Sequence, residues 1–91
     1  MGNKQTHFEL SPKMGVLMYN EFSARLQKMR ERRRISRSVM SELCGLSKSM
    51  ISKYERGEKQ PKLETLVVLS DFFDCSIDYL VGRTDYPGKY N

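Results

Sequence analysis

The chain has 91 residues, of which 38% are hydrophobic and 30% are charged. This length supports one small domain, and this composition is typical of a globular protein rather than of a collagenous or disordered one. No apolar run approaches the roughly 20 residues of a membrane-spanning helix, and the first ten residues lack the apolar segment of a signal peptide. We therefore expect a cytoplasmic protein.

Residues that usually carry metal binding or catalysis are sparse. The only histidine is His7, and the two cysteines, Cys44 and Cys75, lack the spacing of a zinc site, which takes about four ligands. No paired nucleophile and base occurs, and there is no glycine-rich phosphate loop. The sequence therefore predicts no metal, no cofactor and no enzymatic activity, with both cysteines reduced and close to the core.

Charge is distributed unevenly along the chain, whose net formal charge is +5. Residues 21–62 hold 12 lysines and arginines against 5 acidic residues, whereas residues 63–91 hold 2 against 5. A basic part of the chain followed by an acidic part is expected of a domain that contacts phosphates with one end only. Many soluble domains have a basic solvated surface, so charge alone favours nucleic-acid binding only slightly.

The first helix is predicted after an irregular N-terminal segment. Residues 1–20 lack a clear period, so we expect a flexible tail there. Apolar residues then recur at i, i+4 and i+7, which is the stripe of one helix face: Phe22, Leu26 and Met29. This helix is expected to begin at Tyr19 or Asn20, with Asn20 as its N-cap, and to end at Arg33.

Two short helices are predicted next, each with a serine at its N-cap. Ser36 can cap the second helix and Ser47 the third. Gly45 ends the second helix, because glycine adopts the left-handed conformation of a helix C-terminus at little cost, and Gly57 ends the third. The inner face of the second helix is expected to hold Val39, Met40 and Leu43. The inner face of the third is expected to hold Tyr54 with either Met50 or Ile51.

The fourth helix is predicted from about Leu63 to Phe73, and a short fifth helix follows a cap at Ser76. The inward positions of the fourth helix are expected to be Leu63, Leu66, Val67, Leu69, Ser70 and Phe73. The fifth carries Ile77 and Leu80 and ends at Gly82. No segment alternates with a period of two over the length of a strand. The chain is therefore predicted to be all-α, with a tail at 1–20, a five-helix domain at 21–82 and a loose C-terminal tail at 83–91.

The second helix, the turn at Gly45 and the third helix form a helix-turn-helix in the structural sense. Residues 35–57 have the sequence ISRSVMSELCGLSKSMISKYERG, which resembles the lambda-repressor/Cro-type (XRE) helix-turn-helix family without a gap. The resemblance continues through QPKLETLVVLSDFFDCSIDYLVGRTD and covers roughly residues 21–84. It implies the five-helix DNA-binding domain of a transcriptional regulator from bacteria or their phages.

The resemblance implies that the third helix, at about residues 47–56, enters the major groove of double-stranded DNA. Four residues match base-contacting positions of the family: Lys48, Ser49, Ser52 and Lys53. A lysine amine can donate to guanine O6 and N7 or to a phosphate, and a serine hydroxyl can serve either partner with weak specificity. The competing interpretation is that these are ordinary solvated polar positions.

A second set of residues matches positions that contact the DNA backbone: Arg37, Ser36, Ser47, Arg56, Lys59 and Lys62. Such contacts add affinity and salt dependence but carry no sequence information. Ser36 and Ser47 have a second role open to them as helix caps, which is the default. Arg37 stands where the family usually has glutamine, and it can reach a phosphate or a base edge. For Arg25, a contact with the DNA backbone is left open.

The resemblance also implies a buried salt bridge between Arg30 and Glu55, which would tie the first helix to the third. Loss of either partner would leave the other charge uncompensated, at a cost of roughly 3–5 kcal/mol. The basic run from Arg30 to Arg34 ends the first helix, where cations interact favourably with the helix dipole. The family more often has glycine near Arg34, so we expect a strained connection there.

These features predict a sequence-specific DNA-binding regulator, a repressor of phage or mobile-element type, associated with the nucleoid. One copy covers little of the groove, so we expect a homodimer on a pseudo-palindromic operator with half-sites about 34–36 Å apart. The dimer patch is predicted at Phe72, Tyr79, Leu80 and Val81. The alternative is a protein-interaction module of the same fold, such as an antitoxin, whose main partner is an antagonist or toxin protein. RNA binding is disfavoured because no sheet with exposed aromatic side chains is predicted.

Overall fold

The computed structural model describes residues 21–88, and within this range every regular element is a helix. The first helix occupies residues 21–32, and it is followed by α2 (Arg37–Cys44), α3 (Lys48–Glu55), α4 (Leu63–Phe73) and α5 (Ile77–Leu80). The prediction of an all-α domain with five helices is therefore confirmed for this part of the chain. The expectations about residues 1–20, with the N-cap at Asn20, lie outside the described residues. No helix within residues 21–88 has the length and apolar character needed to cross a membrane.

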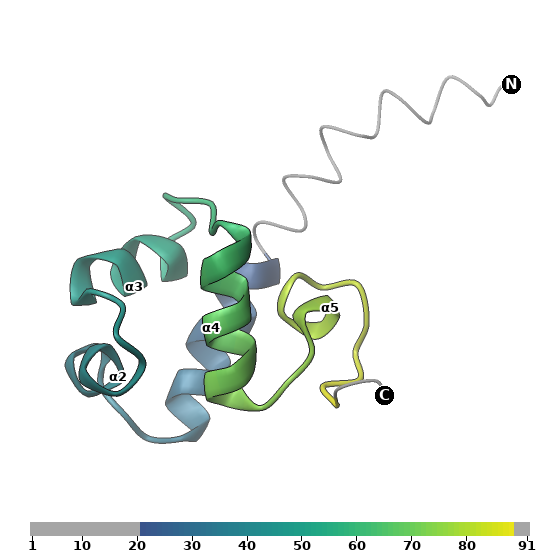
Figure 1. Cartoon of the computed structure of the whole chain (residues 1–91), viewed down its shortest axis with the longest axis horizontal. Coiled ribbons are helices and arrows are strands. Elements are labelled where there is room, and N and C mark those ends of the chain that lie inside the picture. Colours follow the sequence, from purple (N-terminus) through teal and green to yellow (C-terminus); the bar gives the residue numbers. More distant parts are fainter. Residues whose placement is uncertain (1–20, 89–91) are drawn as a thin grey trace, which may run out of the picture.

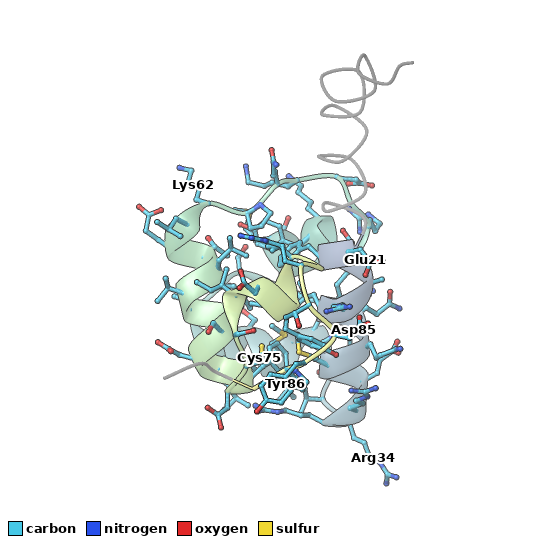
Figure 2. All side chains as sticks on the ribbon, turned by 90° about the vertical axis from the view of Figure 1, so that its right-hand side faces the viewer. Glu21, Arg34, Lys62, Cys75, Asp85 and Tyr86 are labelled. Atoms are coloured by element: carbon cyan, nitrogen blue, oxygen red, sulfur yellow. The ribbon has the colours of Figure 1, made fainter. Side chains whose placement is uncertain are left out.

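Helices α2 and α3 lie at one end of the molecule and α5 lies at the other, with α4 between them (Figure 1). The first helix runs behind α4 in this view, and Figure 2 shows Glu21 and Arg34 near its opposite ends. The helices from the basic part of the sequence, α2 and α3, therefore lie opposite α5, which comes from the acidic part.

One buried core holds the helices together. The first helix contributes the three apolar residues predicted from its period, and the others contribute at least one each: Phe22, Leu26 and Met29, then Met40, Ile51, Tyr54, Leu69, Phe73 and Leu80. The rings of Phe22 and Tyr54 meet edge to face, with their centroids 5.7 Å apart. This contact fixes α3 against the first helix. Of the two residues offered for the inner face of α3, Ile51 is the buried one and Met50 is only partly buried.

Serine caps begin three of the helices as the sequence predicts. The hydroxyl oxygens of Ser36, Ser47 and Ser76 accept hydrogen bonds from backbone N–H groups three residues ahead, at donor–acceptor distances of 3.0, 3.1 and 2.9 Å. Gly45 follows α2 in the left-handed conformation, with φ of 84°, and its N–H donates to the Ser41 carbonyl. Each serine cap contributes about 1 kcal/mol. Gly45 fixes where α2 ends, and Ser47 fixes where α3 begins.

The connection between the first helix and α2 is strained at Arg34, as expected. Its φ is 59°, in the left-handed region that costs an L-residue with a Cβ roughly 1–2 kcal/mol. Its N–H donates to the Glu31 carbonyl at 2.9 Å, and its side chain points away from the body of the protein (Figure 2).

Four apolar side chains that the periodicity assigns to the core are exposed instead. Val39 and Leu43 of α2 are 41% and 63% exposed, and Leu63 and Val67 of α4 are 68% and 44% exposed. The inward row of α2 consists of Met40 with Cys44, which lies one turn further along. An eight-residue helix offers few positions that define its inward direction, and a small rotation of that direction turns Val39 and Leu43 to solvent.

The predicted dimer patch is wrong at Leu80, whereas the part assigned to Phe72, Tyr79 and Val81 stays a prediction because these three side chains are partly exposed. Leu80 is completely buried in the core. The guanidinium of Arg33 lies 5.0 Å from the centroid of the Phe72 ring, and that of Arg25 lies 4.2 Å from the Tyr79 ring. Each ring therefore packs against a cation from the first helix or the turn after it.

The segment after α5 is held on the protein as far as Pro87, which differs from the loose tail expected. Arg25 donates to the backbone carbonyls of Tyr79 and Thr84 and to the Asp85 carboxylate, the last at 2.8 Å. The Ser76 N–H donates to the Pro87 carbonyl at 2.9 Å. Figure 2 shows Asp85 on the segment that crosses in front of the first helix. The guanidinium of Arg25 is thus bound to this segment, so it is not available as a contact for the DNA backbone.

Candidate nucleic-acid interface

The four predicted base-contacting residues lie together on α3. Its inner side is anchored by Ile51 and Tyr54, which are 0% and 1% exposed. Lys48, Ser49 and Lys53 are exposed, and Ser52 is partly buried. Positions 48 and 52 are neighbours on the helix surface, as are positions 49 and 53, because residues four apart share a face. The structure therefore presents two amines and two hydroxyls on one side of a firmly anchored helix.

The two cap serines remain suited to a second role. In each cap the hydroxyl oxygen accepts a backbone N–H, from Val39 for Ser36 and from Met50 for Ser47. A hydroxyl can accept and donate at once, so its own hydrogen is still available to a phosphate oxygen. Both serines are exposed, so capping and a backbone contact are compatible at each.

Arg56, predicted as a phosphate contact, is paired with Glu58. Its Nε lies 2.8 Å from Glu58 Oε2 and its Nη2 lies 2.9 Å from Oε1, with both side chains about half exposed. These hydrogen bonds hold the pKa of Glu58 below its usual value and raise the pKa of Arg56. A phosphate therefore has to compete with an ionised carboxylate for this arginine. This pair was not predicted, although an acid two residues along a tight turn is a signal for it.

Lys59 and Lys62 lie in the connection between α3 and α4. Lys59 is partly buried, whereas Lys62 is exposed and occupies the N-cap position of α4 without a side-chain cap hydrogen bond. Figure 2 shows Lys62 at the outer edge of the molecule, at the start of α4. Both lysines follow α3 directly along the chain, so they can add positive charge beside the end of that helix.

Behind α3, the salt bridge between Arg30 and Glu55 is present as the sequence predicts. Arg30 Nε lies 2.7 Å from Oε2 of the carboxylate, and its Nη2 lies 3.0 Å from Oε1. The hydrogen bonds that Arg30 donates to Glu55 raise the pKa of Arg30, against the opposing effect of burial. Arg30 Nη1 also donates to the Ile35 carbonyl at 2.9 Å, in the connection to α2. The bridge therefore joins the first helix, this connection and α3.

Arg37 enters the same ionic cluster, which the sequence does not predict. Its Nε donates to Glu55 Oε1 at 2.9 Å, and its side chain is 37% exposed while the Glu55 side chain is 1% exposed. Arg37 stands in α2 and Glu55 stands 18 residues away in α3, so no short-range pattern reveals this contact. Through this contact, the carboxylate on α3 is linked to α2, the other helix of the helix-turn-helix.

Comparison of the sequence with known proteins identifies the family of the chain. The helix-turn-helix family model HTH_3 matches residues 26–80. Over 66 residues the chain is 35% identical to the uncharacterised HTH-type transcriptional regulator YobD of Bacillus subtilis (strain 168), which covers 72% of this chain and 59% of that protein. It is 39% identical over 59 residues to the HTH-type transcriptional regulator AnsR of the same strain, covering 65% and 51%. It is 35% identical over 57 residues to the repressor protein C2 of Salmonella phage P22, covering 63% and 26%.

A solved structure has the same fold. The crystal structure of an HTH_3 family transcriptional regulator from Vibrio cholerae matches with a TM-score of 0.66 at 26% identity, over 75% of this chain and 38% of that one. The chain spans 59% and 51% of the lengths of YobD and AnsR. The family model covers more than half of the 91 residues, and several relatives are at least 30% identical. The chain therefore belongs to the HTH_3 helix-turn-helix family.

Proposed function

We propose that the protein binds double-stranded DNA in a sequence-specific manner and regulates transcription, as a repressor. The observation that carries the proposal is α3, which is anchored by Ile51 and Tyr54 and presents Lys48, Ser49, Ser52 and Lys53 on its outer side. The names of two relatives support it, since AnsR is a transcriptional regulator and protein C2 of phage P22 is a repressor.

In this proposal α3 enters the major groove, where the amines of Lys48 and Lys53 donate to base acceptors or to nearby phosphates. The groove is about 12 Å wide and admits one helix. Helix α2 crosses the DNA backbone and holds α3 in place through the turn at Gly45. Ser36, Arg37 and Ser47, with Arg56, Lys59 and Lys62, supply phosphate contacts that set orientation and affinity.

The proposal includes a homodimer on a pseudo-palindromic operator and association with the nucleoid. One copy presents one recognition helix, which reads only a few base pairs, so two copies related by a two-fold axis are needed for useful specificity. The half-sites are then expected to lie about 34–36 Å apart, which is one turn of the duplex.

Selection of duplexes from a random pool by the full chain tests the proposal. We expect the selected duplexes to share a pseudo-palindrome with half-sites one helical turn apart, and sedimentation on the selected duplex to show two protomers. A selection that enriches no common sequence, together with affinity that falls steeply as salt rises, would contradict sequence-specific binding. Sedimentation showing one protomer on DNA would contradict the dimer alone.

A further inference from the structure

The ionic cluster around Glu55 holds more positive charge than the carboxylate requires. The Arg30 guanidinium already pairs with both carboxylate oxygens, at 2.7 and 3.0 Å, so one positive charge balances one negative charge. Arg37 adds a second guanidinium, whose Nε lies 2.9 Å from Oε1. The three side chains therefore carry a net charge of +1, and an anion bound beside them would complete the balance.

The way in which Arg37 is bound leaves suitable donors for such an anion. A guanidinium presents five N–H groups in one plane, and the contact with Glu55 uses only the one on Nε. Within residues 21–88, no contact of the two Nη groups of Arg37 is observed. The side chain is 37% exposed, although the carboxylate that holds it is 1% exposed. The four N–H donors on Nη1 and Nη2 lie in one plane, and Glu55 holds that plane at its Nε edge. This arrangement of donors suits the oxygens of a phosphate.

We infer that Glu55 is a positioning residue for a DNA phosphate contact made by Arg37, an inference that rests on the proposed function. Glu55 does not touch the DNA. Its buried carboxylate fixes the Nε edge of Arg37, so that the Nη edge is directed at a phosphodiester of the duplex. Because Glu55 stands on α3 and Arg37 on α2, the distance between this phosphate and the recognition helix is set by the protein. The contact thereby sets the register in which Lys48 and Ser49 meet the bases.

The contact predicts one sensitive phosphate in each half-site. The test uses the full chain and the selected operator, with single phosphates replaced by neutral methylphosphonates one position at a time. For the wild-type protein, we expect a roughly tenfold loss of affinity when the phosphate bound by Arg37 is neutral, because a charge-assisted hydrogen bond is lost. The Arg37→Gln protein should lose no further affinity when that phosphate is neutral, and it should still lose affinity when other contacted phosphates are neutral. Its salt dependence should fall by about one unit of slope per protomer.

Three further variants separate this role from a purely structural one. Arg83→Gln removes the same charge three residues after the end of α5 and should keep the wild-type pattern. Helix α5 lies at the opposite end of the molecule from α2 and α3 (Figure 1). Arg37→Lys keeps the charge on a single amine, so it should retain the salt slope but lose the position-specific sensitivity. Glu55→Gln should lose the same sensitivity without any DNA contact of its own, and thermal unfolding reports whether each variant is folded.

Each outcome decides the inference. Sensitivity of Arg37→Gln and Arg37→Lys at the same phosphate as the wild type would overturn it, and these two variants decide even where Glu55→Gln fails to fold. Sensitivity retained in a folded Glu55→Gln protein would overturn the role of Glu55. A wild-type protein that prefers no duplex would overturn the proposed function and this inference with it, whereas operator preference without a sensitive phosphate at Arg37 would overturn the inference alone.

Discussion

Single arginine residues determine how much of the positive charge of this protein is available to DNA. Arg25 donates hydrogen bonds to backbone carbonyls of the C-terminal segment, Arg30 donates to Glu55, and Arg56 donates to Glu58. In the sequence each has other basic residues nearby and none has an acidic neighbour four residues further along, although Arg56 has Glu58 two residues ahead. Their roles differ only because of partners brought near by turns and by packing. Formal charge along the chain therefore overestimates the number of free phosphate contacts.

Arg34→Gly is expected to raise the free energy of unfolding by about 1 kcal/mol. The left-handed φ of 59° is unfavourable for arginine and nearly free for glycine, although the greater flexibility of glycine in the unfolded chain offsets part of the gain. Urea denaturation measures the difference. The control is Arg32→Gly, which removes the same charge within the first helix and should lower stability by about 1 kcal/mol. A less stable Arg34→Gly protein would show that this φ is not a source of strain.

Glu58→Gln is expected to tighten DNA binding about threefold at low salt, because Arg56 is then released to a phosphate and a carboxylate is removed from the interface. Fluorescence anisotropy with the selected duplex measures the change at two salt concentrations. Glu64→Gln, which removes an exposed carboxylate from the first turn of α4, is the matched control. The same gain in both variants would indicate a general charge effect rather than the release of Arg56.

At the level of helices, boundaries follow from local sequence while inward faces do not. Ser36, Ser47 and Gly45 were predictable because a cap uses hydrogen bonds that span three or four residues. Leu43 and Leu63 were assigned to the core wrongly because the inward direction of a helix depends on where its neighbours pack. The contact of Arg37 with Glu55 could not be predicted either, since the two residues meet only after α2 and α3 have been placed.

The cluster at Glu55 should respond unequally to loss of its two arginines. Arg30→Met is expected to lower the free energy of unfolding by about 3 kcal/mol, at the low end for a broken buried pair because Arg37 still compensates the carboxylate. Arg37→Met should cost only about 1 kcal/mol, since Arg30 continues to bind both oxygens. Urea denaturation of both variants measures the losses. Equal losses would show that the two arginines share the carboxylate evenly.

Arg25 should hold the C-terminal segment against the first helix. Arg25→Gln removes its hydrogen bonds to Tyr79, Thr84 and Asp85 and its contact with the Tyr79 ring, and we expect a loss of roughly 2 kcal/mol. The Ser76 N–H, which donates to the Pro87 carbonyl, should then exchange its hydrogen faster. Hydrogen exchange followed by NMR measures this amide, with the core amide of Leu69 as the control. Unchanged exchange at Ser76 would show that the segment is held without Arg25.

For the whole molecule, the fold was predictable because apolar periodicity, serine caps and glycine stops agree along residues 21–82. The sequence places the candidate site on α3, since the family motif marks its outer face, and this assignment stays a prediction. The electrostatics of this site were predictable only in part, because Glu58 stands two residues after Arg56 in the sequence, whereas only the folded chain brings Glu55 to Arg37. The position of α2 and α3 at one end of the molecule, opposite α5, is the feature that connects the fold to the proposed function.

The central claim is that the outer side of α3 reads bases while the residues around it bind phosphates. The most direct measurement is the ratio of affinities for the selected duplex and a scrambled duplex of the same composition, at fixed salt. We predict that Lys48→Ala or Ser49→Ala lowers this ratio roughly fivefold or more, whereas Lys59→Ala weakens both affinities equally and leaves the ratio unchanged. A ratio that stays constant in Lys48→Ala and Ser49→Ala would contradict base recognition by α3.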